Sequence, residues 1–177
     1  MKNKSYKISL SAMFVALIFV ATYFIAIPMP AVGYVNLGDA FIILCAIILG
    51  PIYGAICGGV GAMLADILLG FGAYAPATLV IKATMAIACY YVYKLLLKIF
   101  KRPIAIFAGS IVAELIMTLG YFAFEGFVIL HSLAGASLNI VFNLIQGGLS
   151  IVIANIIINI LLASKATRKH IERINKD

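Results

Sequence analysis

Long apolar segments, separated by short polar or glycine-rich breaks, make up most of the chain. Six of them approach the ~20 residues that a helix needs to cross a bilayer. They are Ile8–Ile27, Ala40–Leu49 continuing towards Tyr53, Ala55–Leu69, Ala77–Leu97, Ile104–Leu130 and Leu138–Ala163. The second and third are short, and Gly50-Pro51 between them predicts a tight turn or a kink, because proline lacks a backbone donor and glycine permits a reversal. The pattern therefore predicts a bundle of membrane helices, with six spans for a turn and five for a kink.

The composition excludes a soluble globular protein. Hydrophobic residues make up 65% of the 177 residues, charged residues make up 11%, and the mean hydropathy is +1.17. No linker or block of charge divides the chain, so we expect a single membrane domain over residues 1–177. The net charge of +7 does not indicate nucleic-acid binding, because the basic residues flank the apolar segments. The three cysteines lie in apolar segments, and we expect small core residues there and no metal site.

Basic residues distinguish the two span counts, because Lys and Arg are enriched in cytoplasmic loops. Twelve of the thirteen form three clusters: Lys2, Lys4 and Lys7 at the start, Lys94, Lys98, Lys101 and Arg102 between the fourth and fifth segments, and Lys165, Arg168, Lys169, Arg173 and Lys176 at the end. Six spans with a cytoplasmic N-terminus place all three clusters inside, whereas five would place one or two outside. We therefore predict an all-α integral membrane protein with six transmembrane helices and both the N and C termini cytoplasmic. We also expect the first segment to be a retained helix, because its apolar run is too long for a signal peptide.

In this topology the polar side chains within the apolar segments gather in the outer leaflet. The outer loops 28–38, 70–76 and 129–137 contain no Lys or Arg. The residues that we expect to bind a solute lie in these loops or near the outer ends of the helices: Asn36, Asp39, Tyr74, Lys82, Tyr121, Glu125, Asn139, Asn143 and Gln146. Ionisable groups inside a membrane are costly to bury and therefore indicate a functional site. We predict an outward-facing cavity for a small, flat, heteroatom-rich solute that stacks on aromatic rings and takes hydrogen bonds from fixed groups.

Structural roles stay open for several of these groups. Lys82 could contact the solute or form an ion pair with Asp66 or Asp39, and both could hold at once. Asp66 itself fits a structural role better. The amides of the last segment share one helical face, which suits solute binding but also ordinary interhelical hydrogen bonding. Glu114 lies deeper and is either the floor of the cavity or a buried packing acid.

Two other classes of membrane protein fit the sequence less well. An enzyme would need a nucleophile, base or metal cluster at a common depth, whereas the two histidines are His131 in an outer loop and His170 in the tail. A self-sufficient channel or facilitator would need polar residues through the inner leaflet, and the inner halves of the segments carry few. The sequence also has no G-x-x-x-x-G-K-[ST] phosphate loop, so we expect any ATP to be hydrolysed by a partner.

Several short motifs resemble those of the substrate-binding S components of the energy-coupling factor (ECF) vitamin importers. Ala12 and Ala16 lie four residues apart in the first segment, a spacing that permits close contact between helices in lipid. The other motifs are Val35-Asn36-Leu37-Gly38-Asp39, Leu49-Gly50-Pro51-Ile52-Tyr53-Gly54-Ala55, Ala65-Asp66, Tyr74-Ala75-Pro76-Ala77-Thr78 and Ile81-Lys82. The resemblance covers nearly the whole chain.

The resemblance implies how such a protein would work. An S component binds one vitamin in an outward-facing pocket, docks on a transmembrane coupling protein driven by two cytoplasmic ATPases, and topples to release the solute inside. It implies that Ala12 and Ala16 belong to the docking surface, that the apolar loop 28–38 is part of a lid, and that the chain lies in a bacterial plasma membrane. The Asn-Leu-Gly-Asp and Tyr-Ala-Pro patterns are most similar to the subgroup for hydroxymethylpyrimidine, a thiamine precursor, or pyridoxine. Pantothenate, riboflavin or folate is the alternative, and no cofactor or nucleic-acid partner is expected.

Overall fold

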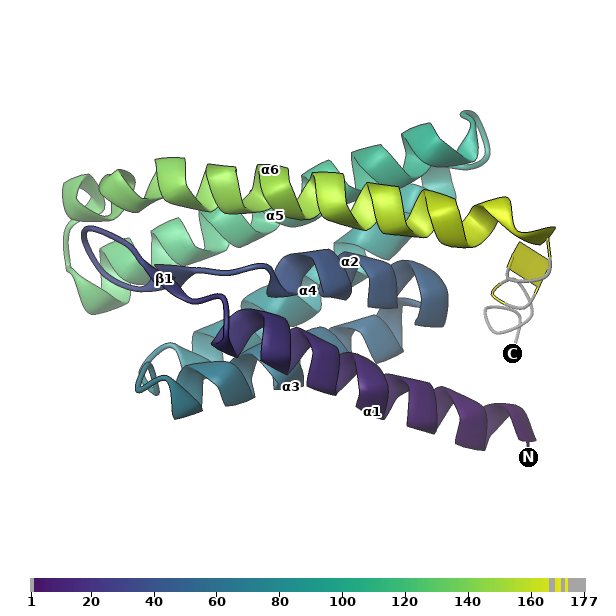
Figure 1. Ribbon diagram of the computed structural model, residues 1–177. Coiled ribbons are helices and arrows are strands. Elements are labelled where there is room, and N and C mark those ends of the chain that lie inside the picture. The colour runs from purple at the N-terminus through teal and green to yellow at the C-terminus, as the bar shows by residue number, and fades with distance from the viewer. Residues whose placement is uncertain (1, 166–167, 170, 172–177) are drawn as a thin grey trace.

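The computed structural model describes residues 2–165, 168–169 and 171, and these residues are helical apart from one short hairpin and the connections (Figure 1). In chain order the elements are α1 (Lys2–Tyr23), β1 (Ile27–Pro28), β2 (Tyr34–Val35), α2 (Gly38–Leu49), α3 (Pro51–Leu68), α4 (Ala75–Leu96), α5 (Arg102–Phe124), the π-helical turn η1 (Glu125–Ile129) and α6 (Leu133–Ala163). The all-α prediction is therefore confirmed, and each predicted apolar segment corresponds to one α-helix.

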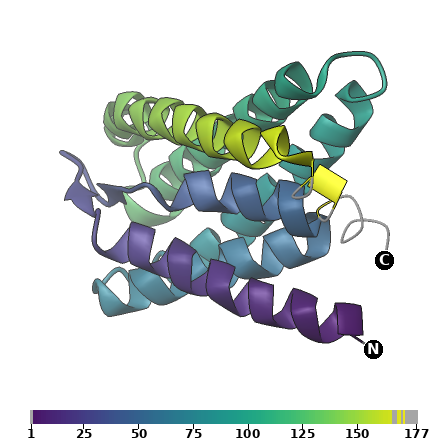
Figure 2. The ribbon, with the colours of Figure 1, turned by 45° about the vertical axis from the view of Figure 1, so that its right-hand side comes forward.

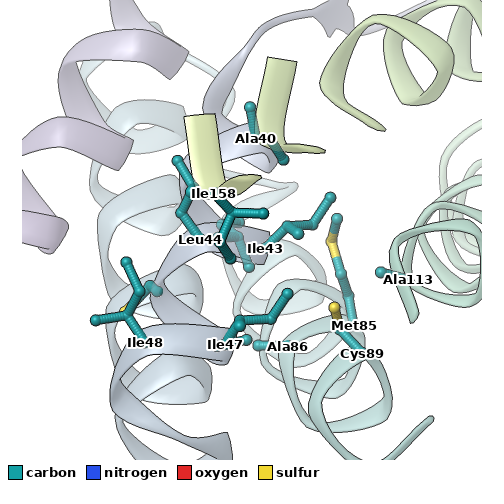
Figure 3. Packing of buried hydrophobic residues seen from close by; sticks show 14 of the residues in the cluster. Ala40, Ile43, Leu44, Ile47, Ile48, Met85, Ala86, Cys89, Ala113 and Ile158 are labelled. Carbon is teal, nitrogen blue, oxygen red and sulfur yellow. The ribbon is translucent and has the colours of Figure 1, made fainter. Parts of the chain in front are cut away.

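The central element of the bundle is α2. Eleven of its twelve residues are buried, and it packs against α1, α3, α4, α5 and α6. A helix enclosed on all sides must be apolar all round, which explains why Gly38–Leu49 is almost continuously apolar. Figure 3 shows part of this core, where Ile43 and Ile47 of α2 lie with Met85 and Cys89 of α4.

The junction at Gly50-Pro51 is a turn and not a kink. Gly50 has a φ of 92°, a left-handed conformation that glycine adopts without a steric penalty, and α3 begins at Pro51. The chain then returns alongside α2 at close range, since a Cβ on Gly54 would lie 2.7 Å from the Cα of Ala46. A Cβ on Gly58 would likewise lie 3.0 Å from Ile42. These two glycines therefore serve packing within the chain.

Among the described residues, five helices are long and apolar enough to cross a membrane: α1 over Ser5–Tyr23, α3, α4, α5 together with η1, and α6. With 12 residues, α2 is ~18 Å long, which is less than the ~30 Å of a bilayer core. Its enclosure lets both of its ends lie among protein groups instead of lipid. The count of six spans stays a prediction.

The basic clusters share one end of the bundle. Figures 1 and 2 place the start of α1, the α4–α5 connection and the C-terminal end of α6 at this end, and the β1–β2 hairpin and the α5–α6 connection at the other. Lys98 and Lys101 in the α4–α5 connection are exposed. Arg173 and Lys176 lie outside the described residues. The described members of the three clusters of basic residues predicted to lie on one side of the membrane therefore belong to one end of the bundle. Which side of the membrane this end faces stays a prediction.

The first helix is shorter at its end than the predicted segment Ile8–Ile27. It stops at Tyr23, and the next residues turn into a hairpin in which Ile27 pairs with Val35 and Pro28 with Tyr34 in antiparallel register. Residues that pair as strands cannot continue a helix. The apolar run in the sequence is therefore longer than the helix itself.

The last helix is longer than the predicted segment Leu138–Ala163. It begins at Leu133, because the side chain of Ser132 caps it by accepting a hydrogen bond from the backbone N–H of Gly135 at 3.1 Å. The connection between α5 and α6 is correspondingly shorter than the predicted loop 129–137.

Candidate functional site

A largely polar cavity lies at the hairpin end of the bundle. It is lined by Thr22, Met29, Gly33, Tyr34, Asn36, Ala62, Asp66, Tyr74, Thr78, Lys82, Tyr121, Glu125, Asn143 and Gln146. These residues come from the hairpin, from the connections before α2 and α4, and from α1, α3, α4, α5, η1 and α6. The cavity volume is about 20 Å³, which is room for a water-sized molecule. The site is therefore a narrow polar space inside an otherwise apolar bundle.

A buried ion pair forms one wall of the cavity. Lys82 Nζ donates to Asp39 Oδ1 at 2.5 Å, and the two side chains are 2% and 0% exposed. The ammonium group also lies 5.2 Å from the centre of the Tyr121 ring, within reach of a cation–π interaction. Asp39 lies in the first turn of α2, where the helix dipole favours a negative charge. Of the two acids considered as partners of Lys82, the structure selects Asp39.

Gln146 connects this ion pair to the entrance of α2. Its Nε2 donates to Asp39 Oδ2 at 2.6 Å, and its Oε1 accepts from the backbone N–H of Asn36 at 2.7 Å. The Asn36 side chain in turn accepts from the backbone N–H of Gly38 at 2.9 Å. The amide of Gln146 therefore fixes the position of α2 relative to α6. The ion pair between Asp39 and Lys82 extends this connection to α4.

Polar contacts also fasten the hairpin to the helices. The Tyr34 hydroxyl donates to the carboxylate of Asp66 on α3. Asn139 Nδ2 on α6 donates to the carbonyl of Val32 at 2.7 Å and to Glu125 Oε2 at 3.0 Å. Each of these contacts joins residues far apart in the sequence, so the hairpin closes the cavity only when the helices are assembled.

The two tyrosines outside the helices act as hydrogen-bond donors to acids. Tyr34 donates to Asp66, and Tyr74 donates to Glu125 Oε1 at 3.4 Å. Burial raises the pKa of both phenols far above the usual range, and the neighbouring carboxyl group raises each pKa further. Both hydroxyls therefore stay protonated at physiological pH and keep donating.

Aromatic rings cover the hairpin end of the cavity. Tyr34, Phe71, Tyr74 and Phe124 form a chain of edge-to-face and tilted contacts, with ring centres 5.0, 5.9 and 5.3 Å apart along it. Tyr121 lies beside Tyr74 with ring centres at 6.4 Å. Such rings offer flat apolar faces next to charged and amide groups, which suits a planar solute with polar substituents.

Seven of the nine predicted binding residues line the cavity. Asp39 and Asn139 lie directly behind this layer, where they hold Lys82, Gln146 and Glu125. Asp66, for which a structural role fitted better, lines the cavity as well as anchoring Tyr34. A role for these residues in binding a solute stays a prediction.

Three other lining residues had no signal in the sequence. Thr22, Met29 and Ala62 are ordinary residues of apolar or loop segments, and only the fold brings them to the cavity. Thr78 also lines it and shares a 2.9 Å hydrogen bond with the Tyr121 hydroxyl. Its place one helical turn before Lys82 could have indicated this, since residues four apart share a helix face.

Two buried polar atoms of lining residues have no hydrogen-bond partner among the described residues. They are Asn143 Nδ2, a donor, and Asp66 Oδ2, an acceptor when ionised. An unpaired buried polar group costs about 1–3 kcal/mol, so both atoms favour a guest that complements them. No group of three or more His, Cys, Asp or Glu side chains that could hold a metal ion occurs in the described part of the chain.

Fold and site together define a membrane-embedded helical protein with a narrow cavity lined by polar groups. The statistical model of the family described as "ECF-type riboflavin transporter, S component" matches residues 2–164. The chain therefore belongs to this family of ECF transporter S components. Members of this family are the substrate-binding components of transporters and not enzymes. They are multi-pass membrane proteins that work with a transmembrane component and ATPases.

Individual proteins resemble this chain as well. An "Uncharacterized protein in gap 3'region" of Pyrococcus woesei is 38% identical over 103 residues, which cover 58% of this chain and 66% of that relative, just under two thirds of its length. The solved structure "Structure and mechanism of the S component of a bacterial ECF transporter" superposes with a TM-score of 0.71 over 90% of this chain and 96% of that one. Its sequence identity is 24%, so this likeness establishes the fold alone.

Proposed function

We propose that this protein captures a single-ring heteroaromatic vitamin or precursor, hydroxymethylpyrimidine or pyridoxine, from outside the cell for an ATP-driven importer. The observation that carries the proposal is the cavity, where the Lys82–Asp39 pair, two unpaired polar atoms and a wall of aromatic rings surround one narrow space. A planar ring can stack on the aromatic side chains while its heteroatoms and hydroxyl groups meet the amides and acids. The site residues are the nine predicted ones together with Asp66 and Thr78.

Riboflavin is the second candidate, because the description of the matching family names it. The size of the cavity supports the smaller solutes. A cavity of about 20 Å³ must widen to admit even one ring, and three fused rings with a ribityl chain demand far greater movement of the lining. Nothing in the site favours pantothenate, folate or a self-sufficient channel.

The hairpin is the part of the site that we expect to move. It is held by the contacts of Tyr34 with Asp66 and of Val32 with Asn139, whereas the helices around it are held by the apolar core. Elements with few buried apolar contacts open at the lowest free-energy cost. Loop 28–38 therefore acts as part of the lid that admits the solute.

The exposed face of α1 is the proposed docking surface for the transmembrane coupling protein. Phe14 and Ile18 of α1 are buried in the bundle, whereas Ala12 and Ala16 are exposed on the other side of the helix. Small residues four apart let a partner helix approach closely in lipid, where packing and not the hydrophobic effect drives association. With six spans and both termini cytoplasmic, the basic end of the bundle faces the cytoplasm. The coupling protein would connect this protein to the two ATPases on that side.

Ala12→Trp is expected to abolish vitamin uptake by cells that carry the complete importer, while the purified variant still binds the solute. The bulky indole prevents close approach of a partner helix, but it lies on the far side of α1 from the cavity. Uptake of radiolabelled vitamin and equilibrium binding measure the two effects. Val152→Trp, at a residue of α6 that is 55% exposed, is the matched control and should leave uptake intact. Normal uptake by Ala12→Trp would show that docking occurs elsewhere.

Mass spectrometry of small molecules released from the purified, denatured protein tests the ligand itself. We expect hydroxymethylpyrimidine or pyridoxine, because a tight binder retains its solute through purification. Equilibrium dialysis of the protein against each of these two and riboflavin then ranks the affinities. Release and tight binding of riboflavin would replace the single-ring proposal, and failure to bind any vitamin would contradict the function as a whole.

A further inference from the structure

A second cavity lies between α5 and α6, and it shares no lining residue with the first. Its volume is about 180 Å³, and its polar lining comes from Glu114 and Thr118 of α5. Two glycines of α6 also line the cavity, and they differ in the room beside them. A Cβ on Gly147 would lie 3.0 Å from Glu114 Cβ and 3.2 Å from its Oε2, whereas a Cβ on Gly148 would have nothing within 4 Å. The acid therefore lies against the backbone of α6 at the edge of an open space.

The polar groups of this cavity have no hydrogen-bond partners among the described residues. Glu114 is 5% exposed and Thr118 is 4% exposed, yet both carboxyl oxygens and the threonine hydroxyl are unpaired. The two residues are four apart on α5 and so share one face of the helix. Since an unpaired buried polar group costs about 1–3 kcal/mol, the pair favours a guest that both donates and accepts a hydrogen bond.

The cavity lies near the middle of two spanning helices and opens sideways. Along α5 and η1, Glu114 is ~18 Å from Arg102 and ~22 Å from Ile129 at 1.5 Å per residue. Leu115 and Leu144 also line the cavity and are 47% and 51% exposed, so in a bilayer they face the acyl chains. A charged carboxylate at this depth is expensive, and the neutral acid is the favoured form. A guest would therefore arrive dissolved in the lipid and carry no charge.

We propose that this cavity is a lipid-accessible binding site for a small uncharged alcohol, whose hydroxyl group pairs with Glu114 and Thr118 while its apolar part lies against the leucines. The neutral carboxyl and the threonine hydroxyl together supply a donor and an acceptor, which is the pattern that an alcohol complements. An apolar cavity of ~150 Å³ holds benzene. The 180 Å³ here accordingly suits a six-membered ring with a hydroxymethyl group, and benzyl alcohol is the probe of that size.

Carbodiimide labelling of the full chain in lipid nanodiscs tests the site. Dicyclohexylcarbodiimide partitions into lipid and adds to a protonated carboxyl group, and the adduct rearranges to a stable N-acylurea that contains all atoms of acid and reagent. Peptide mass spectrometry should find this adduct on Glu114. Benzyl alcohol should protect Glu114, and toluene at the same membrane concentration should protect about twofold to tenfold less well, because it lacks the hydrogen bond.

Two leucine substitutions test whether the reagent reaches Glu114 through this cavity. Gly148→Leu fills the cavity and should abolish labelling although Glu114 is still present. Gly72→Leu is the matched control, because a Cβ there also has nothing within 4 Å, and it should label like the parent. Thr118→Val should keep the label and lose the advantage of benzyl alcohol over toluene.

Three results would overturn the proposal. Labelling of Glu114 by a water-soluble carbodiimide alone would mean that the cavity opens to water and not to lipid. Equal protection by toluene and benzyl alcohol would mean that no hydroxyl group is recognised. Unchanged labelling in Gly148→Leu would mean that the reagent reaches Glu114 by another route. Each result is independent of which vitamin the first cavity binds, or of whether it binds one.

Discussion

Lys82→Met is expected to lower the free energy of unfolding by about 3–5 kcal/mol, because removal of one partner leaves a buried charge without compensation. The Lys82 ammonium lies 2.5 Å from Asp39, and both side chains are almost completely buried. Methionine preserves most of the volume of the lysine stem and removes only the charged end. Asp39 then keeps the amide of Gln146 as its side-chain partner, and an amide cannot neutralise a carboxylate. Equilibrium unfolding in mixed micelles of rising dodecyl sulfate content, followed by circular dichroism, measures the loss.

Two further variants make this result specific. Lys98→Met makes the same substitution at an exposed position and should change the free energy of unfolding by less than about 0.5 kcal/mol. The double variant Lys82→Met/Asp39→Asn removes both charges and should recover part of the loss, as a double-mutant cycle would show. If Lys82→Met were as stable as Lys98→Met, the ion pair would contribute nothing to the fold. A double variant that folds but does not bind the vitamin would assign the pair to recognition as well.

Gln146→Leu is expected to abolish binding of the vitamin while the protein still inserts into the membrane. Gln146 lines the cavity and joins Asp39 Oδ2 to the backbone of Asn36. Leucine leaves both of these groups without that partner, at about 1–3 kcal/mol each, and it exposes an apolar branch to the solute. Without this cross-link Asn36 and Asp39 are no longer held in place at the site, and a loss of about 2 kcal/mol of binding energy lowers the affinity about thirtyfold. Equilibrium dialysis with radiolabelled hydroxymethylpyrimidine and pyridoxine measures the affinity, and size-exclusion chromatography reports that the variant is folded.

Asn143→Leu should have the same effect, because its unpaired Nδ2 is a donor available at the cavity. The matched control is Asn155→Leu. Asn155 is an amide on the same helix that bonds to Ser110 at 3.2 Å and does not line the cavity. Its substitution should leave binding intact. Unchanged binding in both Gln146→Leu and Asn143→Leu would place the solute site elsewhere in the protein.

Much of the cavity lining was readable from the sequence, because charged and amide groups are conspicuous in apolar segments. Lys82, Glu125, Asn143 and Gln146 each interrupt an apolar run, and the rarity of such groups in membrane helices marks them. Helical periodicity then places Asn143 and Gln146 on one face. Thr22 and Met29 carry no such mark, because threonine and methionine are common in membrane helices and loops. Their position at the cavity depends on where the hairpin and the end of α1 lie in the assembled bundle.

Pairings between distant residues were equally beyond the sequence. Asp39 and Asp66 were both possible partners of Lys82, and the choice depends on how α2 and α3 pack against α4. Glu114 was a possible cavity floor or packing acid, yet it lines a different cavity and has no hydrogen-bond partner among the described residues.

By itself the sequence determined that this is a membrane bundle of six apolar helices. It placed the basic residues before the first helix, between the fourth and fifth, and after the last. It placed most of the unusual polar residues near the opposite ends of the helices. Those properties follow from local composition and helical period, which each segment carries whatever its neighbours do. Only the tertiary structure decided that α2 is the enclosed centre, that Lys82 pairs with Asp39, and that the hairpin closes the cavity through Tyr34 and Asn139. These are contacts between segments far apart in the chain, and their energies exist only once the helices have packed.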